Sequence, residues 1–195
     1  MIFYHGSSVL FPKFDLAHAL EGDGKVKFGY GVYLTCSFTS AAHYSHTKSR
    51  PATSHYVYTV EVPDLSADNH IEFKKPVHPD IVKRAEATLG APIDAKHCID
   101  AKDFRKFLAM KLGNAAGVKQ PYRPGDVRSE KLAAEFLKNI GVEYITWPRD
   151  WKNPDKGLNI AVLDDQKIKI LQVHSVELDS KKHLVPGSEK EVSPL

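Results

Sequence analysis

Cysteine is scarce in this sequence, since only Cys36 and Cys98 occur among 195 residues. A small secreted domain without a large core usually depends on several disulfides, and two cysteines cannot supply such a framework. Apolar runs of membrane-spanning length are also missing. The first residues resemble a strand and lack the basic and long apolar parts of a secretory signal. We therefore expect a cytoplasmic protein without a membrane partner, unless export uses a route that needs no signal.

A concentration of charge of one sign is missing too. The net charge is +3, and the lysines are scattered along the chain. Nucleic-acid-binding domains usually gather basic residues on one face, so the sequence indicates no such surface by itself. A basic groove that forms only in the folded chain stays open as an alternative.

Several catalytic motifs are absent as well. The glycines between residues 22 and 31 fit neither the dinucleotide-binding nor the phosphate-loop spacing. No G-x-S-x-G nucleophile motif occurs. His43 and His46 could share a helix face, but no third ligand is evident, so we expect no metal site.

Strand-like patterns lie at both ends of the chain and helical patterns lie between them. Residues 55–62 alternate between apolar and polar side chains, as in a half-buried strand, and residues 79–89, 100–112 and 129–140 have helical spacing. This order lacks a regular βαβ alternation and predicts the α+β class. We expect one domain over residues 1–179, with a helical insertion at about 77–140 and a disordered polar tail at 180–195.

The segment from Phe28 to Tyr44 contains the most informative pattern. Tyr33 follows a Gly-x-Gly sequence in a predicted strand, and Tyr44 lies 11 positions later in a short helical pattern. Singly, each tyrosine is more typical of a core. Together, a strand and the following helix can hold two flat rings with a slot between them, which suits a planar, electron-poor ring. With His5 and Gly6 near the N-terminus, the pattern predicts a nicotinamide site.

In this order, Tyr4-His5-Gly6-Ser7, Phe28–Leu34 and Ser40–Thr47 resemble the catalytic core of the diphtheria-toxin and poly(ADP-ribose) polymerase class of ADP-ribosyltransferases. The opening Phe11–Asp15 also resembles bacterial and phage polyvalent-protein transferases. The resemblance covers residues 2–47 and, more weakly, 157–173, but not the helical middle. It implies two packed, mostly antiparallel sheets around an NAD⁺ cleft.

The resemblance also implies roles for individual residues. The catalytic residues would be His5, Tyr33 and Asn159, and His5 would bind a ribose hydroxyl of NAD⁺. Gly6 would pair its backbone with the carboxamide, and the two tyrosines would enclose the cationic pyridinium ring by stacking and cation–π attraction. The complete set of NAD⁺-binding residues implied in this way is His5, Gly6, Ser7, Tyr33, Ala41 and Tyr44.

Two residues depart from the pattern of the family. Ala41 replaces a serine found in polymerase-type members, and the lost hydroxyl contact is worth about 0.5–1.5 kcal/mol. Asn159 stands where the family has a glutamate, so no negative charge would oppose the developing oxocarbenium ion, at a rate cost of roughly 10²–10³-fold. Chain elongation is therefore not expected. Asn159 could instead simply begin a strand, and Glu143 or Asp164 could substitute as the carboxylate.

Residues 148–157 directly precede Asn159, where this family has its target-recognition loop. The resemblance implies acceptor contacts by Arg149, Trp151 and Lys152, although an ordinary exposed loop is an equal alternative.

The sequence thus predicts a mono-ADP-ribosyltransferase that uses NAD⁺ as co-substrate and modifies an unknown macromolecular acceptor, either protein or nucleic acid. Such enzymes occur among toxins and effectors, so a cognate antitoxin or immunity protein is an expected partner. The alternative is a weakly active or inactive module of the same fold that binds NAD, ADP-ribose or nucleic acid. NAD⁺ hydrolysis without transfer is a third hypothesis.

Overall fold

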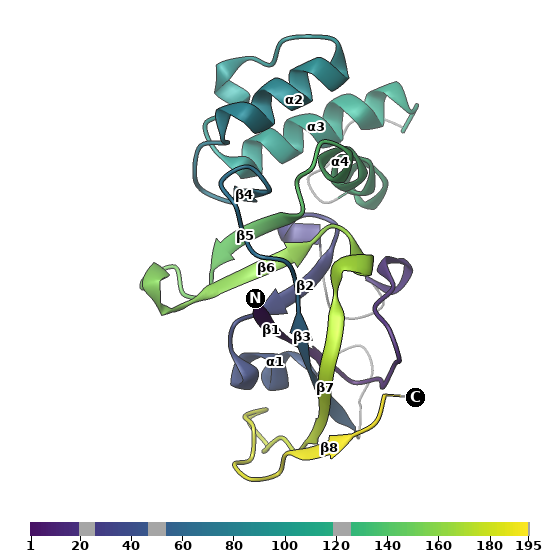
Figure 1. Ribbon diagram of the computed structural model, residues 1–195, viewed down its shortest axis with the longest axis vertical. Coiled ribbons are helices and arrows are strands. Elements are labelled where there is room, and N and C mark those ends of the chain that lie inside the picture. The colour runs from purple at the N-terminus through teal and green to yellow at the C-terminus, as the bar shows by residue number, and fades with distance from the viewer. Residues whose placement is uncertain (20–25, 47–53, 119–125, 195) are drawn as a thin grey trace.

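A computed structural model describes residues 1–19, 26–46, 54–118 and 126–194. Its described strands form one mixed sheet of eight strands in the order β4-β5-β6-β2-β1-β3-β7-β8 (Figure 1). Among these described strands, only β4 and β5 pair in parallel. The strands are β1 (Ile2–Ser7), β2 (Val32–Thr35), β3 (His55–Glu61), β4 (His70–Glu72), β5 (Tyr144–Pro148), β6 (Leu158–Val162), β7 (Lys169–Val176) and β8 (Lys190–Val192).

The α+β class is as predicted, but two packed sheets are not found among the described residues. Strand β1 pairs with β3 along its whole length and with β2 at Tyr4↔Thr35. This single pairing with β2 joins the two halves into one sheet. The expected ADP-ribosyltransferase fold stays a prediction.

Four α-helices occur in the described residues: α1 (Phe38–Tyr44), α2 (Pro79–Leu89), α3 (Ala101–Ala115) and α4 (Val127–Asn139). Helix α1 begins after Ser37, whose side chain accepts a hydrogen bond from the Ser40 N–H. Helices α2 to α4 lie within the expected insertion and gather at the opposite end of the molecule from β8 (Figure 1). None of the helices in the described ranges has both the length and the apolar character needed to cross a bilayer.

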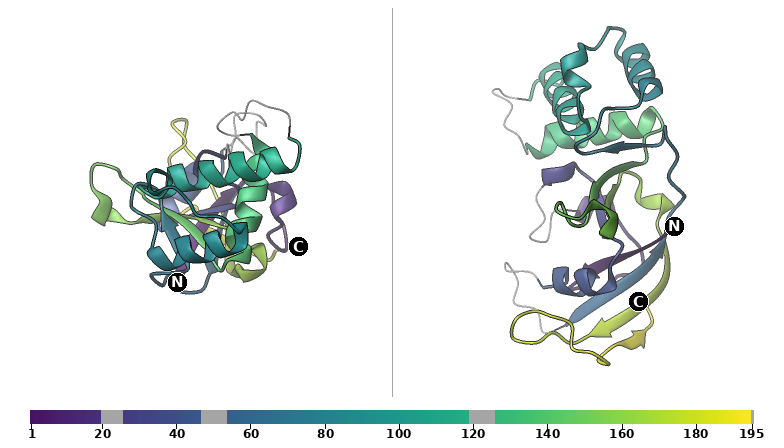
Figure 2. Two further views of the ribbon diagram at one scale, coloured as in Figure 1. Left: turned by 90° about the horizontal axis from the view of Figure 1, so that it is seen from above. Right: turned by 90° about the vertical axis from the view of Figure 1, so that its left-hand side faces the viewer.

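Helices cover one face of the sheet in two separate places. At one place, core residues of α3 and α4 pack with Ile145 of β5 and Ala161 of β6. At the other, α1 places Ala41 and Ala42 against Val57 of β3. Figure 2 shows α1 separated from α2–α4 along the long axis. Strand β2 lies between these two packed regions in the strand order, and this arrangement determines the surroundings of the candidate site.

The opposite face of the sheet is covered mainly by the chain that follows β1. Phe11 stacks on Tyr58 with ring centroids 4.2 Å apart, and Phe14 packs edge-on against both rings. Phe3, Leu34 and other apolar side chains of the central strands complete this part of the core.

The prediction of a disordered tail is wrong for residues 180–194, because these residues are described and include a strand. β8 pairs with β7 through Val173↔Val192 and His174↔Glu191, and Leu178 forms a bridge with Leu184. The segment is polar overall, but β7 offers an edge of backbone donors and acceptors, and Leu184 and Val192 each pack on the core. Residue 195 lies outside the described ranges.

Candidate active site

His5 lies in the middle of β1, opposite Tyr58 of β3. Its Nδ1 is 2.9 Å from the backbone carbonyl oxygen of Tyr33. A carbonyl only accepts hydrogen bonds, so Nδ1 carries the proton, and Nε2 of the neutral ring is an acceptor. The rings of Phe14 and Phe11 lie edge-on at 5.2 and 6.2 Å. Burial lowers the pKa of His5, and the bond to the Tyr33 carbonyl opposes this only in part, so the imidazole is neutral at neutral pH.

Tyr33 is held at both ends. Its backbone carbonyl accepts from His5, and its hydroxyl accepts from the Phe28 N–H at 3.0 Å and donates to the Gly29 carbonyl at 2.9 Å. The ring packs edge-on against Trp147, with centroids 5.3 Å apart. Trp147 in turn stacks on Phe28 at 4.1 Å. We call these three side chains, Phe28, Tyr33 and Trp147, the Tyr33 wall.

The Tyr33 hydroxyl is a poor acid in this setting. Burial raises the pKa of Tyr33 to about 12, despite the hydrogen bond from Phe28. The phenol is therefore uncharged at neutral pH and presents a neutral aromatic surface. This suits stacking rather than proton transfer.

Asn159 is brought to the same face of the sheet as Tyr33. In the antiparallel pairing of β2 with β6, Tyr33 faces Ala161 and Thr35 faces Asn159, and in the neighbouring pair Trp147 faces Asn159. The Oδ1 atom of Asn159 is buried and has no hydrogen-bond partner among the described residues. A buried acceptor without a partner costs about 1–3 kcal/mol, so it marks a position where a ligand hydroxyl or amide would be stabilising.

The two carboxylates considered as substitutes are engaged elsewhere. Glu143 precedes β5, forms an ion pair with Lys167 and accepts a hydrogen bond from Asn69. Asp164 follows the end of β6 that is distant from Asn159, and its carboxylate caps a short 3₁₀ turn at Gln166. Neither is placed to act beside Asn159.

Gly6 presents its backbone to the β2 side of β1. The Val62 N–H donates to the Met1 carbonyl at 3.0 Å, so the odd-numbered residues of β1 bond to β3 and the even-numbered ones point the other way. Registered pairing with β2 is confined to Tyr4↔Thr35, and Gly6 lies beyond it. This orientation is the one needed to pair with a planar amide. The side chain of Ser7 bonds locally to the backbone of Val9.

Helix α1 packs directly on Gly6. A Cβ atom at Gly6 would overlap the carbonyl oxygen of Ala41, so only glycine allows this approach. The side chain of Ala41 is completely buried in the core beneath α1. The structure therefore does not bring Ala41 to the site as a ligand contact, since its methyl group packs between helix and sheet.

Tyr44 is the last residue of α1 and is 64% exposed. Its ring packs edge-on with His43. Among the described residues no ring contact joins Tyr44 to Tyr33, so enclosure of nicotinamide between the two rings stays a prediction.

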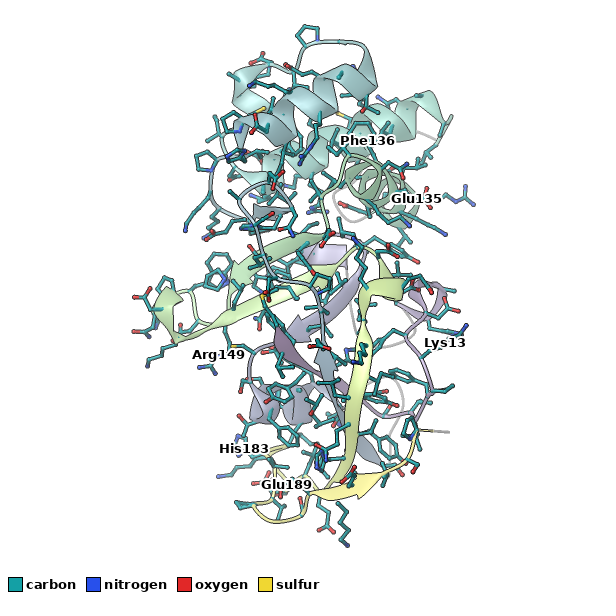
Figure 3. All side chains as sticks on the ribbon, viewed as in Figure 1. Lys13, Glu135, Phe136, Arg149, His183 and Glu189 are labelled. Atoms are coloured by element: carbon teal, nitrogen blue, oxygen red, sulfur yellow. The ribbon has the colours of Figure 1, made fainter. Side chains whose placement is uncertain are left out.

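The three candidate acceptor residues lie in the hairpin between β5 and β6. Arg149 closes the base of the hairpin, since its Nε and Nη2 donate to the Lys156 carbonyl at 3.2 and 3.1 Å. Trp151 is 43% exposed, and the Lys74 ammonium lies 4.5 Å from its ring centroid. Lys152 is exposed. Figure 3 shows Arg149 on the side from which this hairpin projects.

Sequence reasoning missed Phe28, Trp147 and the buried pair Arg105 and Glu130. A signal for the pair does exist. Arg105 lies on the same helical face as Leu108 and Ala109, and Glu130 shares a face with Ala133 and Leu137. Opposite charges at core positions of two helices indicate a buried ion pair.

The described residues contain no group of three or more His, Cys, Asp or Glu side chains that could hold a metal ion. No protein-family model matches the chain, and neither the curated proteins nor the solved structures include a match. Inference about function therefore rests on the residues of the site.

Proposed function

We propose that the chain is a mono-ADP-ribosyltransferase that cleaves the nicotinamide–ribose bond of NAD⁺ and transfers ADP-ribose to a macromolecular acceptor. The observation that carries the proposal is that His5, Tyr33 and Asn159 lie on three neighbouring strands, β1, β2 and β6. Strand β2 pairs with both β1 and β6, His5 bonds to the Tyr33 backbone, and Asn159 lies opposite Thr35. These are the three positions at which the family resemblance requires catalytic residues.

The polar groups at the site match the parts of NAD⁺. Nε2 of the neutral His5 would accept a hydrogen bond from a ribose hydroxyl, and Oδ1 of Asn159 would accept another. The backbone of Gly6 would pair with the carboxamide. The Tyr33 ring would stack on the pyridinium, whose positive charge favours an electron-rich face.

The chemistry of the bond determines what these residues must do. NAD⁺ supplies a glycosidic bond with a neutral leaving group, and the transition state for its cleavage is oxocarbenium-like. Asn159 offers an amide dipole and no charge, so stabilisation would be weaker than with a carboxylate by roughly 10²–10³-fold in rate. Neither His5 nor Tyr33 is ready to donate a proton at neutral pH, given the lowered pKa of His5 and the raised pKa of Tyr33. Both would bind and orient NAD⁺, and the acceptor would supply the nucleophile.

One specific observation favours a second function. Asn159, at the third catalytic position, carries an amide instead of a carboxylate. Without a carboxylate, the site would bind NAD or ADP-ribose and leave the glycosidic bond intact. The chain would then be a binding module of the same architecture.

The test is incubation with labelled NAD⁺ and cell lysate, with nicotinamide release and label transfer measured separately. We expect both, with loss of both in Asn159→Ala and a rate increase of about 10²-fold in Asn159→Glu. Asn114→Ala, at an exposed position of α3, is the matched control and should behave as the parent chain.

Other outcomes would contradict the proposal. NAD⁺ binding without nicotinamide release would establish the binding module. Release without a labelled macromolecule would establish a hydrolase. Full activity in His5→Ala would overturn the assignment of the site.

A further inference from the structure

Arg105 of α3 and Glu130 of α4 form an ion pair inside the helical part of the core. Their side chains are only 4% and 1% exposed. Both come from the segment that the family resemblance does not cover. The pair joins the two helices at a point that faces the turn before β2, as the following contacts show.

Arg105 extends from the ion pair to the turn Val26–Phe28. Its Nη2 donates to the Lys27 carbonyl at 3.2 Å. The stem packs on Gly29, since a Cβ there would lie 3.1 Å from Cδ of Arg105. Gly29 has φ +111°, a conformation that glycine adopts readily. One guanidinium thus holds a helix, a carboxylate and this turn together.

The same turn holds the hydroxyl of Tyr33. The Phe28 N–H donates to it, and it donates to the Gly29 carbonyl. Phe28 also supplies the ring that stacks on Trp147. The path from Glu130 through Arg105 and the turn to the Tyr33 wall is therefore continuous.

Stability alone is a poor explanation for this pair. Burying two charges costs desolvation, and well-packed apolar side chains in their place are often neutral or stabilising. The Nε atom of Arg105 is also buried with no hydrogen-bond partner among the described residues. The planar guanidinium of Arg105 binds a carboxylate and a carbonyl at the same time. It therefore fixes the position of the turn relative to the helices, which an apolar side chain cannot do.

We propose that Arg105, oriented by Glu130, is a positioning residue through which α3 and α4 set the Tyr33 wall of the nicotinamide site. This inference rests on the proposed function, which names NAD⁺ as the ligand. The positioning itself is inferred from the contacts described above. It assigns a role in the site to the helical segment, although Arg105 acts only through the turn and need not touch NAD⁺.

The test replaces the pair with apolar residues of similar size, in Arg105→Met/Glu130→Leu, which leaves no single charge buried. Arg84→Met/Asp68→Leu is the matched control. Arg84 also extends from the helical segment, pairs with a carboxylate and donates to a backbone carbonyl, but it joins α2 to the loop before β4. Far-UV circular dichroism and thermal melting establish that each variant is folded.

Two readouts follow. The KM for NAD⁺ should rise at least about tenfold in the Arg105/Glu130 variant, since small displacements of positioning groups have effects of this size, with a smaller change in kcat and none in the control. In a Trp151→Phe background, the emission of Trp147 and its quenching by nicotinamide report on the wall without any catalysis. We expect a changed emission and weaker quenching.

Arg105→Lys is the second variant, in case the double substitution fails to fold. It keeps the charge but not the fork, and should shift KM in the same direction. Unchanged KM and unchanged Trp147 emission in a folded variant would overturn the inference. If the parent chain neither binds nor cleaves NAD⁺, the proposed function fails, and the Trp147 emission still decides whether the pair positions the wall.

Discussion

The two tyrosines predicted to enclose nicotinamide are held very differently. Tyr33 is fixed through its carbonyl, its hydroxyl and its ring, by contacts from β1, the Val26–Phe28 turn and β5. Tyr44 ends the seven-residue helix α1 and is largely exposed. We call α1 with Tyr44 the Tyr44 wall.

This difference means that only one side of the proposed site is built before a ligand arrives. The Tyr33 wall is neutral, packed and connected to the helical segment, so it would lose little conformational freedom on binding. The Tyr44 ring would have to be ordered by the ligand at an entropic cost. The first wall would therefore set geometry, and the second would adjust affinity.

The largest expected contrast comes from truncating each ring. Tyr33→Ala should lower the free energy of unfolding by up to about 3–5 kcal/mol, the range for buried aromatic side chains, because Tyr33 is partly buried and packs on the core. Tyr44→Ala should change it by no more than about 0.5 kcal/mol, as at ordinary surface positions. Both variants should bind nicotinamide less tightly. Urea denaturation and calorimetric binding measure the two effects, and equal losses of stability would contradict the comparison.

Gly6→Ala tests how the Tyr44 wall packs on β1. The added methyl group would collide with the Ala41 carbonyl and force α1 away from β1, at a cost of about 1–3 kcal/mol. Gly141→Ala is the control. Its φ of +83° makes alanine strained by about 1–2 kcal/mol, but no atom is in the way. Nicotinamide binding should fall in the first variant and persist in the second, and equal binding in both would show that α1 does not form part of the site.

The pH dependence of stability tests the hydrogen bond between the neutral His5 ring and the Tyr33 carbonyl. Burial places the pKa of His5 below 6.5, so under acidic conditions the unfolded chain takes up a proton more readily than the folded one. The stability contributed by neutral His5 is thus complete above pH 6.5 and declines as the pH falls through the lowered pKa, by at most about 1.4 kcal/mol per pH unit.

His5→Asn keeps a donor for the Tyr33 carbonyl and removes this titration. The variant is needed because the pKa of His55 is also lowered by burial. Urea denaturation at pH 5 and pH 7 should show a smaller pH dependence in the variant than in the parent chain. An identical dependence would mean that His5 does not titrate differently in the folded state.

A small effect on stability is also expected outside both walls, at Trp151. Trp151→Ala removes a half-exposed ring and one cation–π contact with Lys74, worth about 0.5–1 kcal/mol. If the hairpin engages the acceptor, label transfer should fall while nicotinamide release is retained. A parallel loss of both would place Trp151 in the NAD⁺ site instead.

Local patterns in the sequence predicted the elements that local physics determines. Helix α2 was predicted with its observed bounds because proline opens it and a left-handed glycine, Gly90, ends it. Strand β2 was predicted because four residues with strand propensity follow a glycine turn. The strand that carries Asn159 was also expected, whereas its pairing with β2, which brings Asn159 to the face of Tyr33, is a non-local contact.

What the sequence could not show depends on non-local contacts. Three-residue β4 has no pattern of its own and exists because β5 pairs with it. An alanine such as Ala41 fits a core or a ligand contact equally well, and only the approach of α1 to Gly6 distinguishes them. The pairing of Arg105 with Glu130 depends on how two helices meet.

The place of β6 in the sheet has a consequence for synthesis of the chain. Strand β6 lies between β2 and β5, so Val32 of β2 pairs with Val162 of β6. Pairings between residues so far apart in the chain form slowly. A growing chain that has released His5 and Tyr33 therefore still lacks both Trp147 of the Tyr33 wall and Asn159. Completion of the sheet, rather than emergence of the N-terminal residues, is the step at which the third position of the site comes into being.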